Sequence, residues 1–180
     1  MNRTFFEESE NQCYDKFLKW QNQTKFFNYY GRVPKCHWSD ASGITEDDYL
    51  FNIELKDRDQ VLCRSGNISG CTKVTNKTYK DNTIIIEGHK MADLLLDYIN
   101  EGIIPLYMNF LHNDVVILYD LTKIKHPKKK RFTTIRSKGY GNSEADYRFE
   151  LPLKDAAIFK AGKLVKKMGV EWNYEGMCDC

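Results

Sequence analysis

The amino-acid sequence predicts an α/β fold with a mixed central β-sheet flanked by helices. Two patterns support this prediction. Short apolar runs typical of β-strands recur between residues 36 and 119, and segments with helical spacing of apolar residues stand before and between them. The chain has 180 residues, of which 42% are hydrophobic, so it is long enough for one domain with a substantial core. We therefore expect a single domain over residues 1–180.

The N-terminal segment predicts a helix. Thr4 and Glu7 have the spacing of a capping box, in which each side chain satisfies a free backbone N–H at the start of a helix. Apolar side chains, among them Phe17 and Trp20, follow at roughly helical spacing. This helix should end before Gly31.

Two strands are expected next. Residues 36–44 predict a short strand with a turn at residues 42–43, and residues 45–48 predict a polar connection. Residues 49–56 alternate between apolar and polar side chains, which is typical of a strand with one face packed against a core. The two strands would form a hairpin.

The middle of the chain combines an irregular stretch with a strand and a helix. Residues 57–82 are rich in polar residues and glycine without a sustained period, which predicts a long, substrate-facing loop. Residues 83–87 predict a buried strand. Apolar side chains between Met91 and Ile99 have helical spacing and predict an amphipathic helix that ends near Gly102.

The remaining elements complete the expected sheet. Residues 105–110 and 115–119 predict two strands joined by a tight connection. This order of strands and helices implies a sheet with both parallel and antiparallel neighbours. After a basic stretch, residues 147–151 predict a weak strand and residues 156–168 a last helix.

The polar face of the strand expected at residues 49–56 carries the most informative motif. Glu54, Leu55 and Lys56 form an acid-x-lysine triplet, and the hairpin would bring Asp40 beside it. Two close carboxylates and the backbone carbonyl of Leu55 are ligands that Mg²⁺ or Mn²⁺ accepts. Lys56 would hold an attacking water and offset charge developing on a phosphate. The pattern predicts a metal-dependent phosphodiesterase site, and an ordinary ion pair on a solvated strand face is the alternative.

A basic stretch predicts a surface that binds phosphate groups. Residues 123–138 contain eight Lys or Arg and no acidic residue, although the formal net charge of the chain is only +2. Its central residues are Lys128, Lys129, Lys130 and Arg131. Phe132 and Tyr140 beside them could stack on bases. A solvated loop without a ligand is the alternative.

Lys90 is a further candidate for binding a phosphate. It stands at the start of the helix expected around residues 91–99, where its charge would add to the free backbone N–H groups. An ordinary lysine on the helix surface is the alternative. Glu87 could support the metal site, although pairing with Lys90 is the simpler expectation.

The six cysteines and the hydropathy of the chain point to a cytoplasmic protein with reduced thiols. No Cys-x-x-Cys pair is present, and we expect no signal peptide. Disulfides between the cysteines and a soft-metal site built from Cys178, Cys180, Cys36 and His37 are the alternatives. No apolar run approaches the ~20 residues of a membrane span, so we expect no membrane partner.

The order of these elements resembles the αβββαβ core of the PD-(D/E)XK nuclease superfamily, the restriction-endonuclease-like fold. The resemblance rests on a helix, a strand with Asp40, a strand with residues 54–56, a loop, a strand, a helix and a strand. The segments 85–90, 107–110 and 116–119 also look like those of small phage-type members. The resemblance covers about residues 4–120.

The resemblance implies roles for the motif residues. In that family an acid precedes the acid-x-lysine strand by a short hairpin, which implies Asp40 and Glu54 as metal ligands and Lys56 as the catalytic lysine. The family's acid usually follows proline or an apolar residue, whereas Asp40 follows Ser39. The open substitutes for Asp40 are Asp47 and Asp48. The first helix often adds a glutamate to the metal site, and the candidates here are Glu7, Glu8 and Glu10.

The resemblance further implies a hydrolase that binds DNA, an endonuclease dependent on magnesium (Mg²⁺) or Mn²⁺. The alternative is a catalytically inactive module on the same fold, such as a nucleic-acid-binding, packaging or virion protein of a phage. A phage-encoded protein would act in the host cytoplasm or in the virion, as a homodimer or in a larger assembly. The complete set of Asp40, Glu54 and Lys56 favours catalysis.

Overall fold

A seven-stranded sheet forms the centre of the molecule in the computed structural model, which describes residues 3–34, 39–63, 68–70, 83–124, 127–133 and 145–169. In spatial order its strands are β1 (Tyr29–Arg32), β2 (Ala41–Ile44), β3 (Leu50–Asp57), β7 (Ile104–Phe110), β8 (Val115–Asp120), β11 (Ala157–Lys160) and β12 (Lys163–Lys166). β3 and β7 are parallel, and the other neighbours are antiparallel. The predicted mixed sheet is confirmed.

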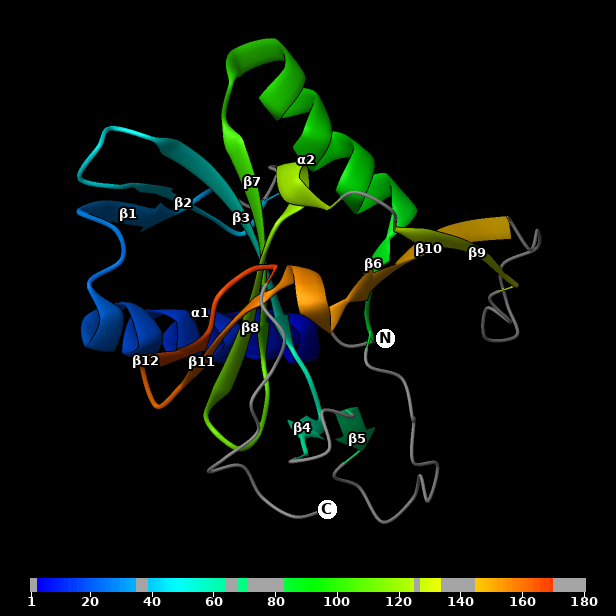
Figure 1. Cartoon of the computed structure of the whole chain (residues 1–180), viewed down its shortest axis with the longest axis horizontal. Coiled ribbons are helices and arrows are strands. Elements are labelled where there is room, and N and C mark those ends of the chain that lie inside the picture. Colours follow the sequence, from blue (N-terminus) through cyan, green and yellow to red (C-terminus); the bar gives the residue numbers. More distant parts are fainter. Residues whose placement is uncertain are drawn as a thin grey trace.

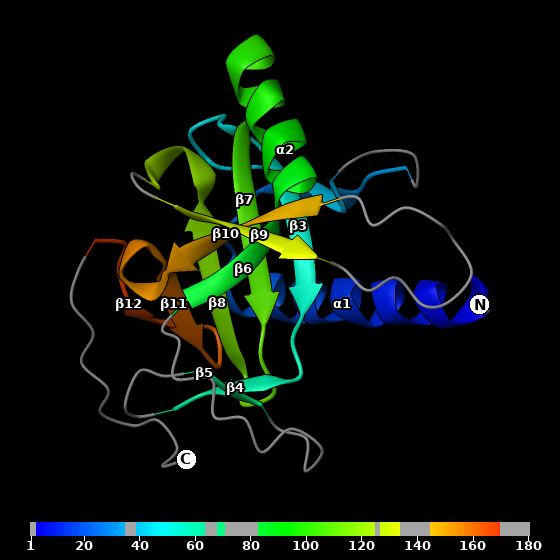
Figure 2. The same ribbon diagram turned by 90° about the vertical axis from the view of Figure 1, so that its right-hand side faces the viewer.

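Two helices cover opposite faces of this sheet. α1 (Arg3–Thr24) lies on one face and α2 (Gly88–Glu101) on the other (Figure 1, Figure 2). α2 links β6 (Thr83–Glu87) to β7 and thereby provides the crossover that parallel β3 and β7 require. The expected α/β fold with flanking helices is therefore confirmed.

Smaller elements complete the described part of the chain. A three-stranded sheet in the order β6-β10-β9 lies on the α2 side and contains β10 (Ala145–Pro152) and β9 (Lys128–Thr133). The short strands β4 (Gln60–Leu62) and β5 (Ile68–Gly70) pair with each other, and the 3-10 turns are η1 (Leu121–Lys123) and η2 (Leu153–Asp155). No helix among the described residues is long and apolar enough to cross a membrane.

Aromatic packing fixes α1 against the sheet. Phe17 and Trp20 are buried, and the Trp20 ring meets Phe159 of β11 edge to face with centroids 5.3 Å apart. Phe27, just after the helix, packs on Phe51 of β3 at 5.5 Å. Such large buried rings contribute much of the stability of a core. The register of α1 along β3 is therefore well defined.

The alternation of β3 decides which side chains face each helix. Its apolar residues Phe51, Ile53 and Leu55 belong to the core beneath α1. Asn52 and Glu54 point to the other face, where Asn52 donates a short hydrogen bond to Asp97 of α2. The sequence predicted this division, and it buries Glu54 under α2.

The turn expected at residues 42–43 is wrong. Both residues lie within β2, and a Cβ atom on Gly43 would come within 2.5 Å of the Phe27 ring. The glycine thus makes room for an aromatic side chain instead of bending the backbone. The actual turn follows β2, where Thr45 and Tyr49 are joined by a backbone hydrogen bond and Asp48 has a φ of 61°.

The last helix, expected at residues 156–168, is also wrong. The segment forms the hairpin of β11 and β12. Ala161 and Gly162 connect the strands with φ angles of 47° and 77°, which is the geometry of a tight hairpin turn. The two apolar runs with a glycine between them were the overlooked signal.

Three other expectations need revision. The irregular stretch at residues 57–82 contains β4 and β5, so it is wrong for those residues, and residues 64–67 and 71–82 lie outside the described part. β1 was not predicted. Cys63 is disulfide-bonded, so the expectation of reduced thiols is wrong there. Disulfides are typical of oxidising compartments, and the cysteines therefore give no support to a cytoplasmic location.

The soft-metal alternative falls on residues that the structure does not describe. Cys36, His37, Cys178 and Cys180 all lie outside the described ranges. Among the described cysteines, Cys13 is a free thiol.

Candidate active site

The end of β3 forms one wall of a cleft, because its neighbour β2 stops before it. The pairing of β2 with β3 begins at Ala41 and Ile53, and the Asp40 N–H donates to the Ile53 carbonyl at 2.9 Å. Beyond this point β3 has an open edge. A cleft of about 310 Å³ opens there. Its lining residues are Ser9, Glu10, Cys13, Tyr14, Arg32, Asp40, Glu54, Leu55, Lys56, Asp57 and Lys90.

Asp40 is fixed to the open edge of β3 by its side chain. Its Oδ2 accepts a hydrogen bond of 2.8 Å from the Leu55 N–H. In a β-strand the N–H and C=O groups of one residue leave on the same side. The Leu55 carbonyl therefore also faces the edge that Asp40 occupies.

Glu54 is buried in the cleft floor with its oxygens unequally satisfied. Its side chain is 1% exposed, and Oε1 lies 2.7 Å from the Lys90 Nζ and 3.7 Å from the Lys56 Nζ. Oε2 is buried without a hydrogen-bond partner among the described residues. A buried carboxylate oxygen left in this state is costly unless something else binds it.

The protonation of Glu54 reflects this environment. Burial, together with the negative charge of Asp40, raises the pKa of Glu54 from 4.5 to about 7, although Lys90 and Lys56 act in the opposite direction. At neutral pH the carboxyl is therefore partly protonated. Perturbed acids of this kind are concentrated at functional sites.

Lys56 lies between two carboxylates. Its Nζ is 3.7 Å from Glu54 and 3.9 Å from Oε1 of Glu87. Burial by itself would raise the pKa of Glu87, but Lys56, a backbone hydrogen bond, Arg58 and Lys90 together hold it below its ordinary value. Glu87 thus stays charged, and its direct ion-pair partner is Lys56 and not the expected Lys90.

The Lys90 side chain points into the cleft. It is therefore not the ordinary surface lysine of the alternative. Burial would lower its pKa, but the charge and hydrogen bond of Glu54 outweigh burial and raise it. Lys90 therefore stays positively charged, with its charge directed at Glu54.

The other acidic residues that were considered as metal ligands lie in different parts of the structure. Asp47 and Asp48 lie in the turn between β2 and β3, at the far end of β3 from the cleft. Glu10 lines the cleft, where its carboxylate lies 3.8 Å from the Arg32 guanidinium. Glu8 is exposed and does not line the cleft, and the side chain of Glu7 lies outside the described residues.

Two charged residues and one thiol of the cleft were not predicted from the sequence. Arg32 belongs to β1, whose short polar sequence carries no clear strand pattern. Asp57 directly follows Lys56 and pairs with Lys16 of α1 at 2.6 Å. Burial first, and then Asp57 and Asp40, raise the pKa of Cys13 to about 12, so this thiol is protonated and unreactive.

Residues 128–133 form a strand and not the expected alternative of a loop, and their binding of phosphate stays a prediction. β9 pairs antiparallel with β10. Lys128 and Lys129 are exposed, and Lys130 makes an ion pair with Glu150. None of them lines the cleft. The side chains of Arg131 and Phe132, and all of Tyr140, lie outside the described part.

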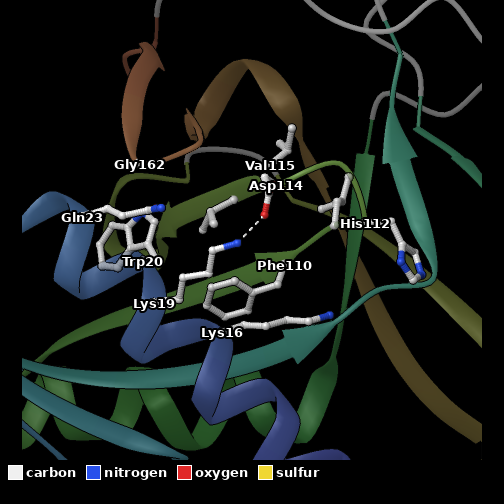
Figure 3. A pocket seen from close by; sticks show the side chains of 11 residues that line it. Lys16, Lys19, Trp20, Gln23, Phe110, His112, Asp114, Val115 and Gly162 are labelled. Carbon is white, nitrogen blue, oxygen red and sulfur yellow. Dashed lines mark hydrogen bonds and ion pairs between the residues drawn. The ribbon is translucent and has the colours of Figure 1, made fainter.

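A second cleft of about 220 Å³ lies between α1 and the turns after β7 and β11. Figure 3 shows Lys19 and Asp114 pointing toward each other across it, and their charged atoms are 2.9 Å apart. Both side chains are more than half exposed. It therefore lacks the buried, incompletely satisfied carboxylate that distinguishes the first cleft.

Comparison with known protein families, with curated proteins and with solved structures finds no match. Within the described residues, no group of three or more His, Cys, Asp or Glu side chains has the arrangement of a metal site. A hard cation in the cleft would therefore depend on two carboxylates, a backbone carbonyl and water, a ligand set that Mg²⁺ accepts because it usually keeps several waters.

Proposed function

We propose that the protein is a nuclease that uses a divalent cation, Mg²⁺ or Mn²⁺, to hydrolyse phosphodiester bonds in DNA. The observation that carries this proposal concerns the Glu54 carboxylate. It is buried close to Asp40, and one of its oxygens has no hydrogen-bond partner among the described residues. A purely structural acid would gain stability from a complete set of partners. An acid that must bind a cation needs a free oxygen.

The residues present fit a hard divalent cation. Asp40, Glu54 and the Leu55 carbonyl would hold it, since all three are oxygen donors at the open edge of β3. When bound, the cation supplies a Lewis acid for the phosphate and lowers the pKa of a coordinated water. Its charge would also offset the repulsion between the two carboxylates that raises the pKa of Glu54.

Two lysines carry the remaining chemistry of the proposed reaction. Lys56, with a side chain 31% exposed and held between Glu54 and Glu87, can donate a hydrogen bond to a water in the cleft and orient it toward phosphorus. Lys90, 28% exposed, can donate to a non-bridging phosphate oxygen and stabilise the charge that grows there. Both are positioned in advance by the buried Glu54, and Lys56 also by Glu87, which limits the reorganisation needed during the reaction.

A catalytically inactive nucleic-acid-binding or phage structural protein is the second candidate. The observation that favours it is the 2.7 Å contact between Lys90 and Glu54, which already neutralises the buried acid in part. In such a protein the cluster would be an ion network that holds α2 against β3.

A cleavage assay separates the two candidates. Purified protein is incubated with circular, linear and single-stranded DNA in the presence of Mg²⁺, Mn²⁺ or EDTA. The nuclease proposal predicts cleavage that requires the cation and is lost in Glu54→Gln. Lys19→Ala is the control, because Lys19 also pairs with an acid in a cleft but away from Glu54. No cleavage by a folded wild-type protein in any lane would favour the inactive module.

A further inference from the structure

A groove of about 470 Å³ runs between the start of α2 and the strands β9 and β10. This volume lies in the range of sites that hold small organic ligands. Met91, Ala92 and Leu95 of α2 and Phe149 of β10 form its apolar part. Tyr147 and Lys129 contribute an exposed aromatic ring and a positive charge.

Close backbone packing fixes one end of this groove. A Cβ atom on Gly88 would come within 2.6 Å of the Tyr147 carbonyl oxygen, so only glycine permits α2 to start directly against β10. The first turn of α2 and the Tyr147 backbone are thereby held in contact.

The chemistry of the groove fits a nucleobase together with its phosphate. Tyr147 is 45% exposed, and the Lys129 Nζ lies 4.0 Å from the centre of its ring. No acidic side chain is among the described residues that line the groove. Lys129 is exposed on the edge strand β9 and lines the groove, so a phosphate-bearing strand meets positive charge there. Aromatic rings beside basic side chains are typical of proteins that bind single-stranded nucleic acid.

The groove and the cleft are adjacent along α2. Gly88 and His89 line the groove, while Lys90, the next residue, lines the cleft and contacts Glu54. The two sites therefore adjoin, on different sides of the first turn of α2. A strand of nucleic acid that contacts Lys90 would pass beside the groove.

We propose that this groove binds an unstacked base of a single-stranded nucleic acid, with Tyr147 stacking on the base and Lys129 contacting its phosphate. Double-stranded DNA keeps its bases stacked and cannot insert one without distortion, so the groove favours single strands, frayed ends or flaps. This inference uses the proposed nuclease function to name the ligand, but binding does not require cleavage.

Binding is measured by fluorescence anisotropy with labelled oligothymidine and with a blunt duplex, in EDTA so that no cleavage occurs. Tyr147→Ala removes the stacking ring, and Ala92→Glu puts a negative charge on an exposed position of the groove without touching the core. Tyr49→Ala removes another exposed tyrosine, in the turn before β3, and serves as the control. Circular dichroism checks that each variant is folded.

Both groove variants should bind oligothymidine about ten-fold more weakly than the wild type, while Tyr49→Ala and the affinity for duplex stay unchanged. Should Tyr147→Ala fail to fold, Ala92→Glu decides alone. Wild-type affinity in the folded variants would overturn the proposal and leave the groove as a docking surface for a protein segment. An equal loss for duplex would also overturn it. The nuclease proposal fails separately, by absence of cleavage in Mg²⁺ while the binding results stand.

Discussion

Two regions of the molecule carry the lysines that the proposed function uses, the cleft at the open edge of β3 and the edge strand β9, and the surroundings of these lysines differ. In the cleft, Lys56 and Lys90 are about one-third exposed, and both lie within 4 Å of the buried Glu54 carboxylate. On β9, Lys128 and Lys129 are exposed at the rim of the small sheet.

This difference gives the two groups of lysines different expected roles, catalysis in the cleft and attraction of nucleic acid on β9. A charge that is held near a buried acid has a defined position, and it acts in surroundings where electrostatic interactions are strong. An exposed charge is screened by salt and mobile, so it attracts a polyanion without orienting it. The cleft should therefore determine the rate of the reaction, and β9 should determine the affinity.

The largest expected effect is the loss of cleavage in Lys56→Ala. Without this side chain no donor remains between Glu54 and Glu87 to orient a water, so the rate constant should fall at least about a hundred-fold. Single-turnover cleavage of a labelled DNA measures it. Lys128→Ala is the matched control and should keep its rate constant at saturating protein. An equal decrease of the rate constant in both variants would contradict the different roles of the two regions.

A second prediction concerns how stability depends on pH. Because folding raises the pKa of Glu54 from 4.5 to about 7, the folded protein binds more protons than the unfolded chain between these pH values. The stabilising contribution of protonated Glu54 is complete below pH 4.5 and is lost as the pH rises through 7. The size of the loss is at most about 3 kcal/mol, since one pKa unit corresponds to roughly 1.4 kcal/mol.

Urea unfolding of the wild type and of Glu54→Gln between pH 4 and 8 measures this contribution. The free energy of unfolding of the wild type should decrease relative to that of Glu54→Gln as the pH rises. Lys128→Ala should follow the wild type throughout. Parallel curves for the wild type and Glu54→Gln would mean that Glu54 is ionised normally, which contradicts the account of the cleft.

A smaller effect is expected for Glu87→Gln. Lys56 would lose one of the two carboxylates that hold it, so cleavage should slow by about ten-fold while DNA affinity stays the same. Glu87→Asp, which keeps the charge, should recover part of the rate. A change in affinity with an unchanged rate would instead assign Glu87 to substrate binding.

The smallest effect is expected for single lysines of β9. Lys128→Ala should weaken DNA binding modestly and reduce the slope of log K against log salt by about 0.9, the value for one lost phosphate contact. Lys130→Ala is the comparison. Because Lys130 already pairs with Glu150, removing the Lys130 side chain should change the salt dependence of binding less. Binding titrations at several salt concentrations measure both. Identical slopes for the wild type and Lys128→Ala would exclude β9 from the DNA surface.

The elements predicted well are those whose periodicity agrees with their final packing. β3 alternates between the α1 core and the α2 face, and α2 buries Met91 and Leu94 at helical spacing before Gly102 ends it. Regular burial of this kind produces a regular spacing of apolar residues, which can be recognised in the sequence.

The wrong predictions concern segments that contain a glycine and strands in which apolar and polar residues do not alternate. Gly43 makes room for the Phe27 ring inside a strand, whereas Gly162 connects the two strands of a hairpin. β11 is buried on both faces, so its residues do not alternate and resemble a helix segment. Such cases are decided by tertiary contacts.

The candidate site was predicted in part. The motif identified Asp40, Glu54 and Lys56, which the fold gathers in one cleft. The depth of burial of Glu54 and the contact from Lys90 depend on how α2 crosses β3, a long-range feature that local spacing does not contain. The groove beside β10 likewise depends on the pairing of strands that are distant in sequence.

The most direct test of the central claim is calorimetric titration of Mn²⁺ into the wild type and Glu54→Gln, at pH 7 and pH 9, in buffers of different ionisation enthalpy. The claim predicts a site that Glu54→Gln abolishes. It also predicts release of about half a proton per ion at pH 7 and almost none at pH 9, because a carboxyl with a pKa of about 7 must lose its proton to bind a cation. Equal binding by both proteins, or no proton release at pH 7, would contradict it.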